Sequence, residues 1–418
     1  MQVDKIICHC RQLLTLSGSR APRTGTAMSD LGLIPDGALA IRDSRIESVG
    51  ETAEILARYS TDEVIQARDS VVLPGFVDCH THPVFVHTRE DEFAQRLAGK
   101  SYVEIAKSGG GIRSTIATTR AADEDQLYEL ARKRIQRMIG QGTTTLEAKS
   151  GYGLDTESEL KQLRVIDRLA HDLPIRIVPT FMGAHEFPAE YKDDHPAYID
   201  ILCDEMLPAV AEQGIAQFCD IFTEAHVFSI GESRRVLNCA REHGLRLKMH
   251  ADEIEPIGGA ELAAELECVS ADHLGAASDA GIEALRKAGV IPVLLPATLF
   301  SLRSKSYARG REMIDRGLPV AIATDYNPGS CNCDSLPLTM SIACLQMGLN
   351  PAEALCASTV NAAHALGLAG DVGSLEPGKS ADFTIWDIPS LNFLPYHLGS
   401  SHLTGVFSRG NRIWGTEL

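Results

Sequence analysis

Short segments typical of β-strands occur at both ends of the chain. Near the N-terminus, residues 38–41 and 45–49 flank a polar turn at 42–44. Near the C-terminus, residues 382–386 form one candidate strand, and residues 406–408 and 412–414 flank the turn Arg409-Gly410-Asn411. Apolar segments separated by turn residues indicate β-hairpins. We therefore expect residues 1–73 and 374–418 to combine into one small composite β domain.

The middle of the chain alternates between short apolar runs and longer segments with helical periodicity. Helices are predicted near 157–171 and 230–243, and strands at 143–147, 175–180, 217–222, 245–250, 269–273, 291–295 and 320–325. This alternation predicts a parallel sheet, and at least seven such units favour a closed (β/α)8 barrel over residues 74–373. An open doubly wound sheet is the alternative, but no G-x-G-x-x-G follows a first strand.

Composition narrows the class of protein. The chain has 418 residues, of which 44% are hydrophobic and 23% charged, the balance of a globular protein. Its net charge of −17 disfavours nucleic acid and anionic membranes as partners. The 11 cysteines have no disulfide-like spacing and no apolar run is long enough to span a membrane, so we expect a cytoplasmic protein. A substrate with a carboxylate would need a local arginine.

The motif His80-Thr81-His82 is the strongest local sign of chemistry. In a strand, residues i and i+2 point to the same side, so both imidazoles would project together. Imidazole is a preferred ligand of zinc and iron. The motif alone is also compatible with two unrelated histidines at a strand end.

Three later residues favour a metal site. His250, His273 and Asp325 each end a predicted strand. A barrel gathers the carboxyl ends of all its strands on one face, so these residues should converge with His80 and His82. The sequence therefore predicts a metal site there.

These motifs resemble the amidohydrolase superfamily. The shared segments are P-G-F-V-D-C-H-T-H at 74–82, A-T-D at 323–325 and G-S-L-E-P-G-K-S-A-D at 373–382. More specific segments resemble the family within it that hydrolyses 4-imidazolone-5-propanoate to N-formimidoyl-L-glutamate in histidine degradation. They lie at 89–96, 109–112, 147–154, 181–185, 250–253, 258–263 and 324–330.

The resemblance implies one metal ion, zinc or iron. Its ligands would be His80, His82, His250 and Asp325. Such a site keeps one position for a water, whose pKa the metal lowers toward ~7. Some relatives hold two metals through a modified lysine, and Lys149 is the candidate here, but its motif belongs to a single-metal family. We expect no second metal.

The resemblance also implies the residues that act on the substrate. Glu253, His273 and Asp325 would be catalytic, with Asp325 moving a proton and His273 stabilising the oxyanion. Arg89 would bind the substrate carboxylate through its guanidinium. The other substrate-binding residues would be Tyr152, His185, Glu253, Asn327, Gly329 and Ser330.

Two other functions stay open at this point. The first is a deaminase of a purine-like or pyrimidine-like ring, which would need the same metal but no carboxylate-binding arginine. The second is an inactive barrel that serves as a binding scaffold, although no expected metal ligand is missing. The partner we expect is a small imidazolone bearing a carboxylate, with a homodimer as the expected assembly.

Overall fold

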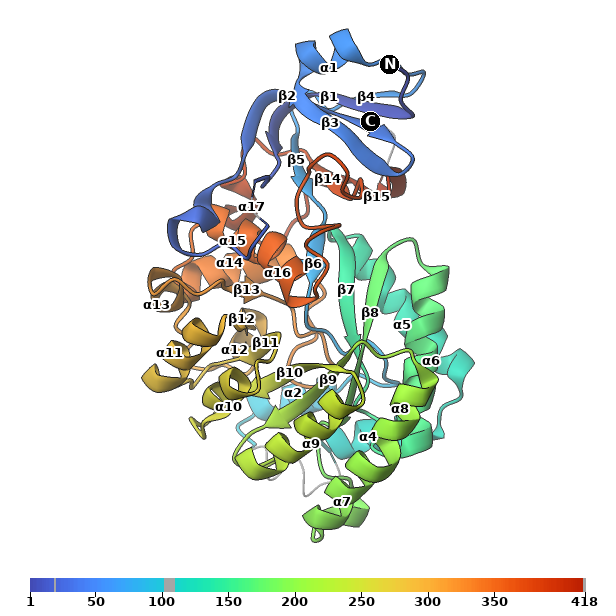
Figure 1. Cartoon of the computed structure of the whole chain (residues 1–418), viewed down its shortest axis with the longest axis vertical. Coiled ribbons are helices and arrows are strands. Elements are labelled where there is room, and N and C mark those ends of the chain that lie inside the picture. Colours follow the sequence, from blue (N-terminus) through green and yellow to red (C-terminus); the bar gives the residue numbers. More distant parts are fainter. Residues whose placement is uncertain (19, 101–109, 416–418) are drawn as a thin grey trace.

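Two eight-stranded sheets organise the chain (Figure 1). The computed structural model describes residues 1–18, 20–100 and 110–415. The first glycine of the motif at 109–112 therefore lies outside the described residues. One sheet uses both ends of the chain and the other uses the middle, which confirms the predicted fold class.

The sheet formed by both chain ends, the composite sheet, is mixed. Its hydrogen-bonded order is β16-β15-β14-β5-β1-β2-β3, with β4 beside β1. The two predicted hairpins are β2–β3 and β15–β16. Asp43 and Ser44 have positive φ in the first turn, a conformation that asparagine, aspartate and glycine tolerate best. The strands are β1 (Lys5–Leu14), β2 (Leu33–Arg42), β3 (Arg45–Glu51), β4 (Val64–Gln66), β5 (Val71–Pro74), β14 (Phe383–Trp386), β15 (Leu403–Ser408) and β16 (Asn411–Gly415).

The second sheet is parallel and follows chain order from β6 to β13. Its two edge strands, β6 and β13, are joined by hydrogen bonds between the residues that follow them. The Asp325 amide donates to the His80 carbonyl at 3.0 Å, and the His82 amide donates to the Tyr326 carbonyl at 2.8 Å. These bonds close the sheet into a barrel. The strands are β6 (Phe76–Asp78), β7 (Thr143–Lys149), β8 (Arg176–Ala184), β9 (Phe218–Thr223), β10 (Arg246–Ala251), β11 (Ser270–His273), β12 (Ile291–Leu294) and β13 (Ala321–Ile322).

The last barrel strand is shorter than the expected 320–325. Only Ala321 and Ile322 pair with β12. Beyond them, the Thr324 amide donates to the Asp78 carboxylate at 3.0 Å, so the segment turns toward β6. The hydrogen bonds that a longer strand would make to β12 are replaced by bonds that close the barrel.

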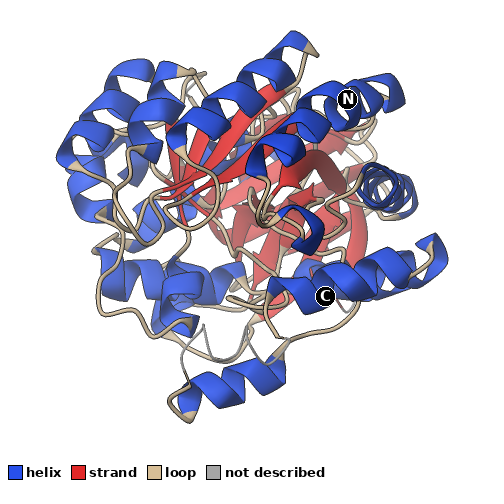
Figure 2. Ribbon diagram, turned by 90° about the horizontal axis from the view of Figure 1, so that it is seen from below, coloured by secondary structure: helices blue, strands red, loops and turns tan. Residues whose placement is uncertain are grey.

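Helices surround the barrel strands (Figure 2). Several begin at side-chain caps: Asp155 accepts from the Ser158 amide before α6, and Ser229 and Glu232 form a capping box before α9. The helices are α1 (Thr52–Arg58), α2 (Glu90–Leu97), α4 (Ile112–Ala121), α5 (Glu124–Ile139), α6 (Thr156–Asp172), α7 (His195–Ile201), α8 (Leu207–Gln213), α9 (Ile230–Glu242), α10 (Gly259–Glu265), α11 (Asp279–Ala288), α12 (Pro296–Ser301), α13 (Gly310–Asp315), α14 (Leu336–Met347), α15 (Pro351–Ala357), α16 (Val360–Ala365) and α17 (Phe393–Tyr396).

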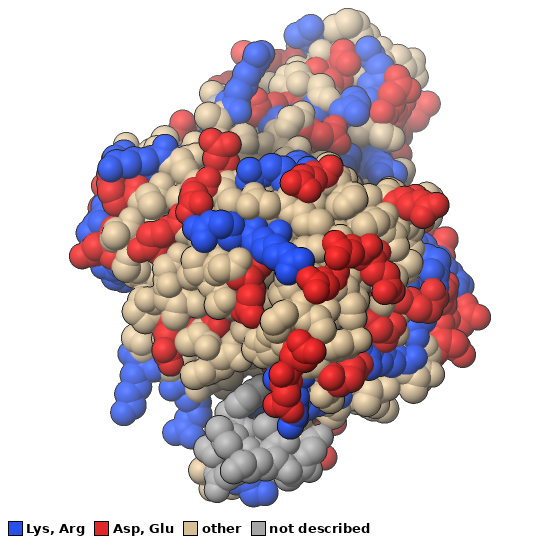
Figure 3. Space-filling view, turned by 60° about the horizontal axis from the view of Figure 1, so that its bottom comes forward, with Lys and Arg blue, Asp and Glu red and all other residues tan. Residues whose placement is uncertain are grey.

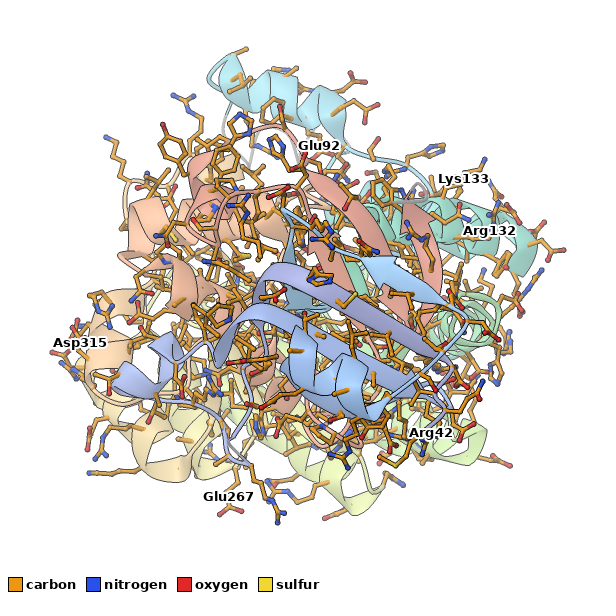
Figure 4. The ribbon with its side chains drawn as sticks, turned by 90° about the horizontal axis from the view of Figure 1, so that it is seen from above. Arg42, Glu92, Arg132, Lys133, Glu267 and Asp315 are labelled. Atoms are coloured by element: carbon orange, nitrogen blue, oxygen red, sulfur yellow. The ribbon has the colours of Figure 1, made fainter. Side chains whose placement is uncertain are left out.

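The composite sheet lies at the end of the barrel where β6 begins, so the carboxyl ends of the barrel strands face away from it (Figure 1). Seen from above, its strands lie in front of the barrel, with Arg42 and Glu92 on opposite sides of the view (Figure 4). The chain passes from the composite sheet to the barrel between β5 and β6. The exact domain boundaries at 73 and 374 stay a prediction.

The face that carries the carboxyl ends has acidic and basic side chains interspersed (Figure 3). Among the described helices, none is both long and apolar enough to cross a membrane.

Candidate metal centre and substrate cavity

Four predicted metal ligands meet at the carboxyl end of the barrel. Ring nitrogens of His80, His82 and His250 lie within 4.8 Å of one another. The Nε2 atoms of His80 and His82 are 3.3 Å apart, and Asp325 Oδ1 is 3.7 Å from each of them. All four residues are buried. They are thus close enough to bind a single ion together.

The bonds that close the barrel also place the aspartate. Asp325 has a positive φ of 51°, and its amide is tied to the His80 carbonyl. The Thr298 hydroxyl donates to Asp325 Oδ2 at 2.7 Å, which leaves Oδ1 toward the histidines. Main chain and side chain together therefore fix which oxygen faces the site.

Buried carboxylates set the orientation of two histidines. His80 Nδ1 donates to Asp272 Oδ2 at 2.5 Å, and His250 Nδ1 donates to Asp220 Oδ1 at 3.0 Å. An imidazole whose Nδ1–H is bound in this way presents the Nε2 lone pair on its other side. This is the arrangement by which proteins orient histidine ligands of metals.

The electrostatics of the cluster suit a cation. Burial, together with Lys149 and the neighbouring histidines, holds the pKa of His80 well below its usual range. Burial and His185 do the same for the pKa of His82. The neutral imidazoles converge with their nitrogen lone pairs facing one another. These lone pairs repel, and a positive ion bound between them would remove that repulsion. The residues present fit a metal.

Lys149 does not resemble a second metal ligand. Its ammonium lies 2.6 Å from Asp220 and 2.9 Å from Glu147. Burial alone would lower the pKa of Lys149, but Asp220, Glu147 and Asp272 outweigh it and raise that pKa. Lys248 adds a second ammonium, 2.8 Å from Glu147. The ammonium groups thus already neutralise the nearby carboxylates.

A cavity of about 350 Å³ opens beside the histidines. It brings together nearly all the site residues predicted from the sequence. His82, His250 and Asp325 lie at one part of its wall; the other predicted residues that line it are Arg89, Tyr152, His185, Glu253, His273, Asn327, Gly329 and Ser330. His80 alone among them does not line it.

Arg89 lies against the loop that follows β13. Its amide donates to the Pro328 carbonyl at 3.0 Å, and its side chain has an exposed fraction of 16%. The Nε atom is buried and has no hydrogen-bond partner among the described residues. Glu92 Oε2 lies 3.8 Å from the Nε atom of Arg89. Arg89 therefore retains a donor for a ligand.

The side-chain amide of Asn327 forms its hydrogen bonds within the loop that follows β13. Its Oδ1 accepts from the amides of Gly329 and Ser330 at 2.8 Å, and its Nδ2 donates to Ser330 Oγ at 2.8 Å. These contacts are those of a tight turn. Asn327 lines the cavity, but its first effect is to shape the loop against Arg89.

Glu253 and His273 form a pair at the cavity wall. Glu253 Oε2 is 3.6 Å from His273 Nδ1. Burial, with smaller effects from Asp325 and Glu224, raises the pKa of Glu253 to about 8. Burial and His250 hold the pKa of His273 well below its usual range. Both pKa shifts favour the uncharged forms of the pair.

Several supporting residues were missed by the sequence analysis. Glu224 accepts from the amides of Ile254 and Glu255, on the C-terminal side of Glu253. Asp252 is fully buried, because its carboxylate accepts from the first two amides of α10. Asp272 precedes a predicted strand end, and that position is the only signal that could have marked it.

Comparisons with known proteins agree on one family. The amidohydrolase family profile matches residues 71–413. The imidazolonepropionase of Symbiobacterium thermophilum is 50% identical over 415 residues, which cover 98% of this chain and 97% of that protein. That of Geobacillus kaustophilus is 49% identical over 410 residues, 97% of this chain and 96% of that protein.

Solved structures share the fold. The guanine deaminase of E. coli superposes with a TM-score of 0.77 at 15% identity, covering 99% of both chains. An adenosine deaminase from Xanthomonas campestris with bound zinc superposes with a TM-score of 0.73 at 18% identity, covering 99% of this chain and 93% of that one. At such identities the likeness concerns the fold alone.

Proposed function

The chain belongs to the imidazolonepropionase family of the amidohydrolases, and from this premise we propose that it hydrolyses the ring C–N bond of 4-imidazolone-5-propanoate. The product would be N-formimidoyl-L-glutamate, an intermediate of histidine degradation. One observation carries the proposal: a single cavity is lined both by members of the histidine–aspartate cluster and by the partly buried guanidinium of Arg89, whose Nε has no hydrogen-bond partner in the described part of the chain.

The metal would be held by His80, His82, His250 and Asp325. When bound, zinc or iron supplies Lewis acidity, which makes a water acidic enough to lose a proton near neutral pH. The donor set of three imidazoles and one carboxylate suits either ion. One ion per chain is proposed, because the carboxylates beside Lys149 are already paired with ammonium groups.

Two carboxyl groups are suited to the two proton movements of ring opening. Water must lose a proton as it attacks the ring carbonyl, and the departing ring nitrogen must gain one. Burial raises the pKa of Asp325 to about 6, so its carboxylate is ionised at pH 7 and can take the first proton. Glu253, with a pKa of about 8, is protonated and can give the second.

We assign the remaining roles to His273 and to the cavity residues that would bind the substrate. A neutral His273 can donate a ring N–H to the carbonyl oxygen as it gains negative charge. Arg89 would bind the propionate through paired hydrogen bonds. Tyr152, His185 and Ser330 would contact the ring or the propionate, and Gly329 would allow the guanidinium to approach the main chain.

The deaminase alternative has less support. A neutral purine or pyrimidine gives no role to the guanidinium of Arg89, which lines the cavity with Glu92 3.8 Å from its Nε. We keep the homodimer and a cytoplasmic location as proposals that come from the sequence and the family.

The test is direct turnover. Purified metal-replete enzyme should consume 4-imidazolone-5-propanoate and release N-formimidoyl-L-glutamate, followed by mass spectrometry. The matched control is an imidazolone that carries a neutral group in place of the propionate, for which we expect little turnover. Equal turnover of both compounds would refute the carboxylate site, and absence of product would refute the function.

A further inference from the structure

We propose that Lys149 is a positioning residue of the metal centre: its ammonium fixes the two carboxylates that orient His80 and His250. The inference rests on the metal-binding part of the proposed function. It concerns a residue that does not line the substrate cavity and whose side chain bonds to carboxylates other than that of Asp325. Lys149 ends β7 and is completely buried.

The contacts form a chain from one lysine to two histidines. Lys149 Nζ donates to Asp220 Oδ2 at 2.6 Å, and the other oxygen of Asp220 accepts His250 Nδ1. On the other side, Nζ is 3.8 Å from Asp272 Oδ2, the atom that accepts His80 Nδ1. One positive charge thus lies beside both carboxylates that hold metal-binding imidazoles.

The three carboxylates around Lys149 would repel one another without it. Glu147, Asp220 and Asp272 all have completely buried side chains. Like charges in a low-dielectric interior interact strongly, so removal of the ammonium favours separation or rotation of the carboxylates. Either movement tilts the imidazoles that they hold. The three ring nitrogens would then no longer converge on one point.

The neighbouring Lys248 provides a matched control. It is equally buried and carries the same charge. Its Nζ donates to Glu147 at 2.8 Å and to the Cys79 carbonyl at 3.0 Å. It lies 4.0 Å from Asp272 and forms neither a hydrogen bond nor an ion pair with Asp220. Loss of Lys248 therefore removes a buried charge of the same kind but leaves the link to His250 intact.

The experiment compares Lys149→Met with Lys248→Met. Metal is removed from each folded protein by a chelator, and the affinity for Zn²⁺ is measured by competition with a chromogenic chelator. Cobalt-substituted samples report ligand geometry through their visible spectrum. Because residues that orient metal ligands typically contribute about 10–100-fold to metal affinity, we expect Lys149→Met to weaken Zn²⁺ binding by at least tenfold and to change the cobalt spectrum. Lys248→Met leaves the Asp220–His250 link in place, so it should weaken binding clearly less than Lys149→Met does.

Two outcomes would overturn the proposal. One is a Lys149→Met affinity within threefold of the unmodified enzyme; the other is an equal loss in both variants, which would indicate a general effect of buried charge. If Lys149→Met does not fold, Asp220→Asn breaks the same link, and an unchanged Zn²⁺ affinity in that variant would also contradict it. No substrate is present in these measurements, so they can succeed or fail independently of the imidazolone assay.

Discussion

The guanidinium of Arg89 lies against the backbone of Gly329, so that a Cβ on Gly329 would be only 1.2 Å from Nη2. Any side chain at 329 must therefore displace the guanidinium. Because a displacement of about 1 Å can cost up to about 100-fold in an enzyme site, we predict that Gly329→Ala raises KM for imidazolonepropanoate by at least tenfold. The kcat should change by less than about threefold, since the metal ligands are untouched.

Gly370→Ala is the control for this variant. Gly370 has no atom within 4 Å of the added methyl group, and steady-state kinetics should match those of the unmodified enzyme. An unchanged KM in Gly329→Ala would mean that Arg89 does not bind the substrate in its present position.

Arg89→Lys tests the guanidinium itself. Lysine keeps the charge but loses the planar pair of donors that matches a carboxylate. Hydrogen bonds to charged groups contribute about 1.5–3 kcal/mol each, so KM should rise about 10–100-fold. Arg113→Lys, a substitution outside the residues that line the cavity, is a suitable control. Equal KM values for Arg89→Lys and the unmodified enzyme would exclude Arg89 from carboxylate binding.

Glu159 holds the loop that carries Tyr152. From α6, this buried carboxylate accepts from the amides of Gly151, Gly153 and Leu154 at 3.0, 2.8 and 2.9 Å. Glu159→Ala would leave three buried donors unpaired, at about 1–3 kcal/mol each. We predict a loss of about 3 kcal/mol or more in the free energy of unfolding, measured by urea denaturation, and a raised KM.

The conservative variant separates loop support from charge at this position. Glu159→Gln keeps one acceptor oxygen, so it should recover most of the stability and of the KM that Glu159→Ala loses. A Glu159→Ala variant as stable as the unmodified protein would show that the loop finds other partners.

The pH profile tests the proton donor. Protonated Glu253 is the active form in this account, so kcat/KM should fall as the pH rises through about 8. Burial raises the pKa of Glu253, and the neighbouring carboxylates of Asp325 and Glu224 add to the effect. Glu224→Gln removes one negative charge, which makes ionisation of Glu253 easier and lowers its pKa. The alkaline limb should therefore move to lower pH; a limb that moves to higher pH would contradict the role of Glu253.

The sequence predicted the elements that have strong periodicity or clear turns. The helix near 157–171 is observed as Thr156–Asp172 and the strand at 245–250 as Arg246–Ala251. The convergence of His80, His82, His250 and Asp325 followed from the single rule that barrel strands end on one face. These features depend on local patterns or on topology, both of which the sequence contains.

Contacts between distant buried charges could not be predicted in the same way. Lys149 and Asp220 are 71 positions apart in the sequence. Their contact depends on which strands are neighbours in the barrel and on the register between them. The burial of Asp252 depends on bonds to the amides of Gly259 and Ala260, seven and eight residues along the chain, which the local pattern around Asp252 does not predict. Such residues become recognisable only when the three-dimensional neighbours are known.

The most direct test of the central claim is a metal titration of chelator-treated enzyme with imidazolonepropanoate turnover as the readout. One catalytic ion held by His80, His82, His250 and Asp325 predicts activity that rises linearly with added Zn²⁺ or Fe²⁺ and reaches its plateau at one ion per chain. In His250→Ala, activity should no longer reach a plateau at one ion per chain. Full activity without metal, or a plateau that requires two ions per chain, would contradict the account.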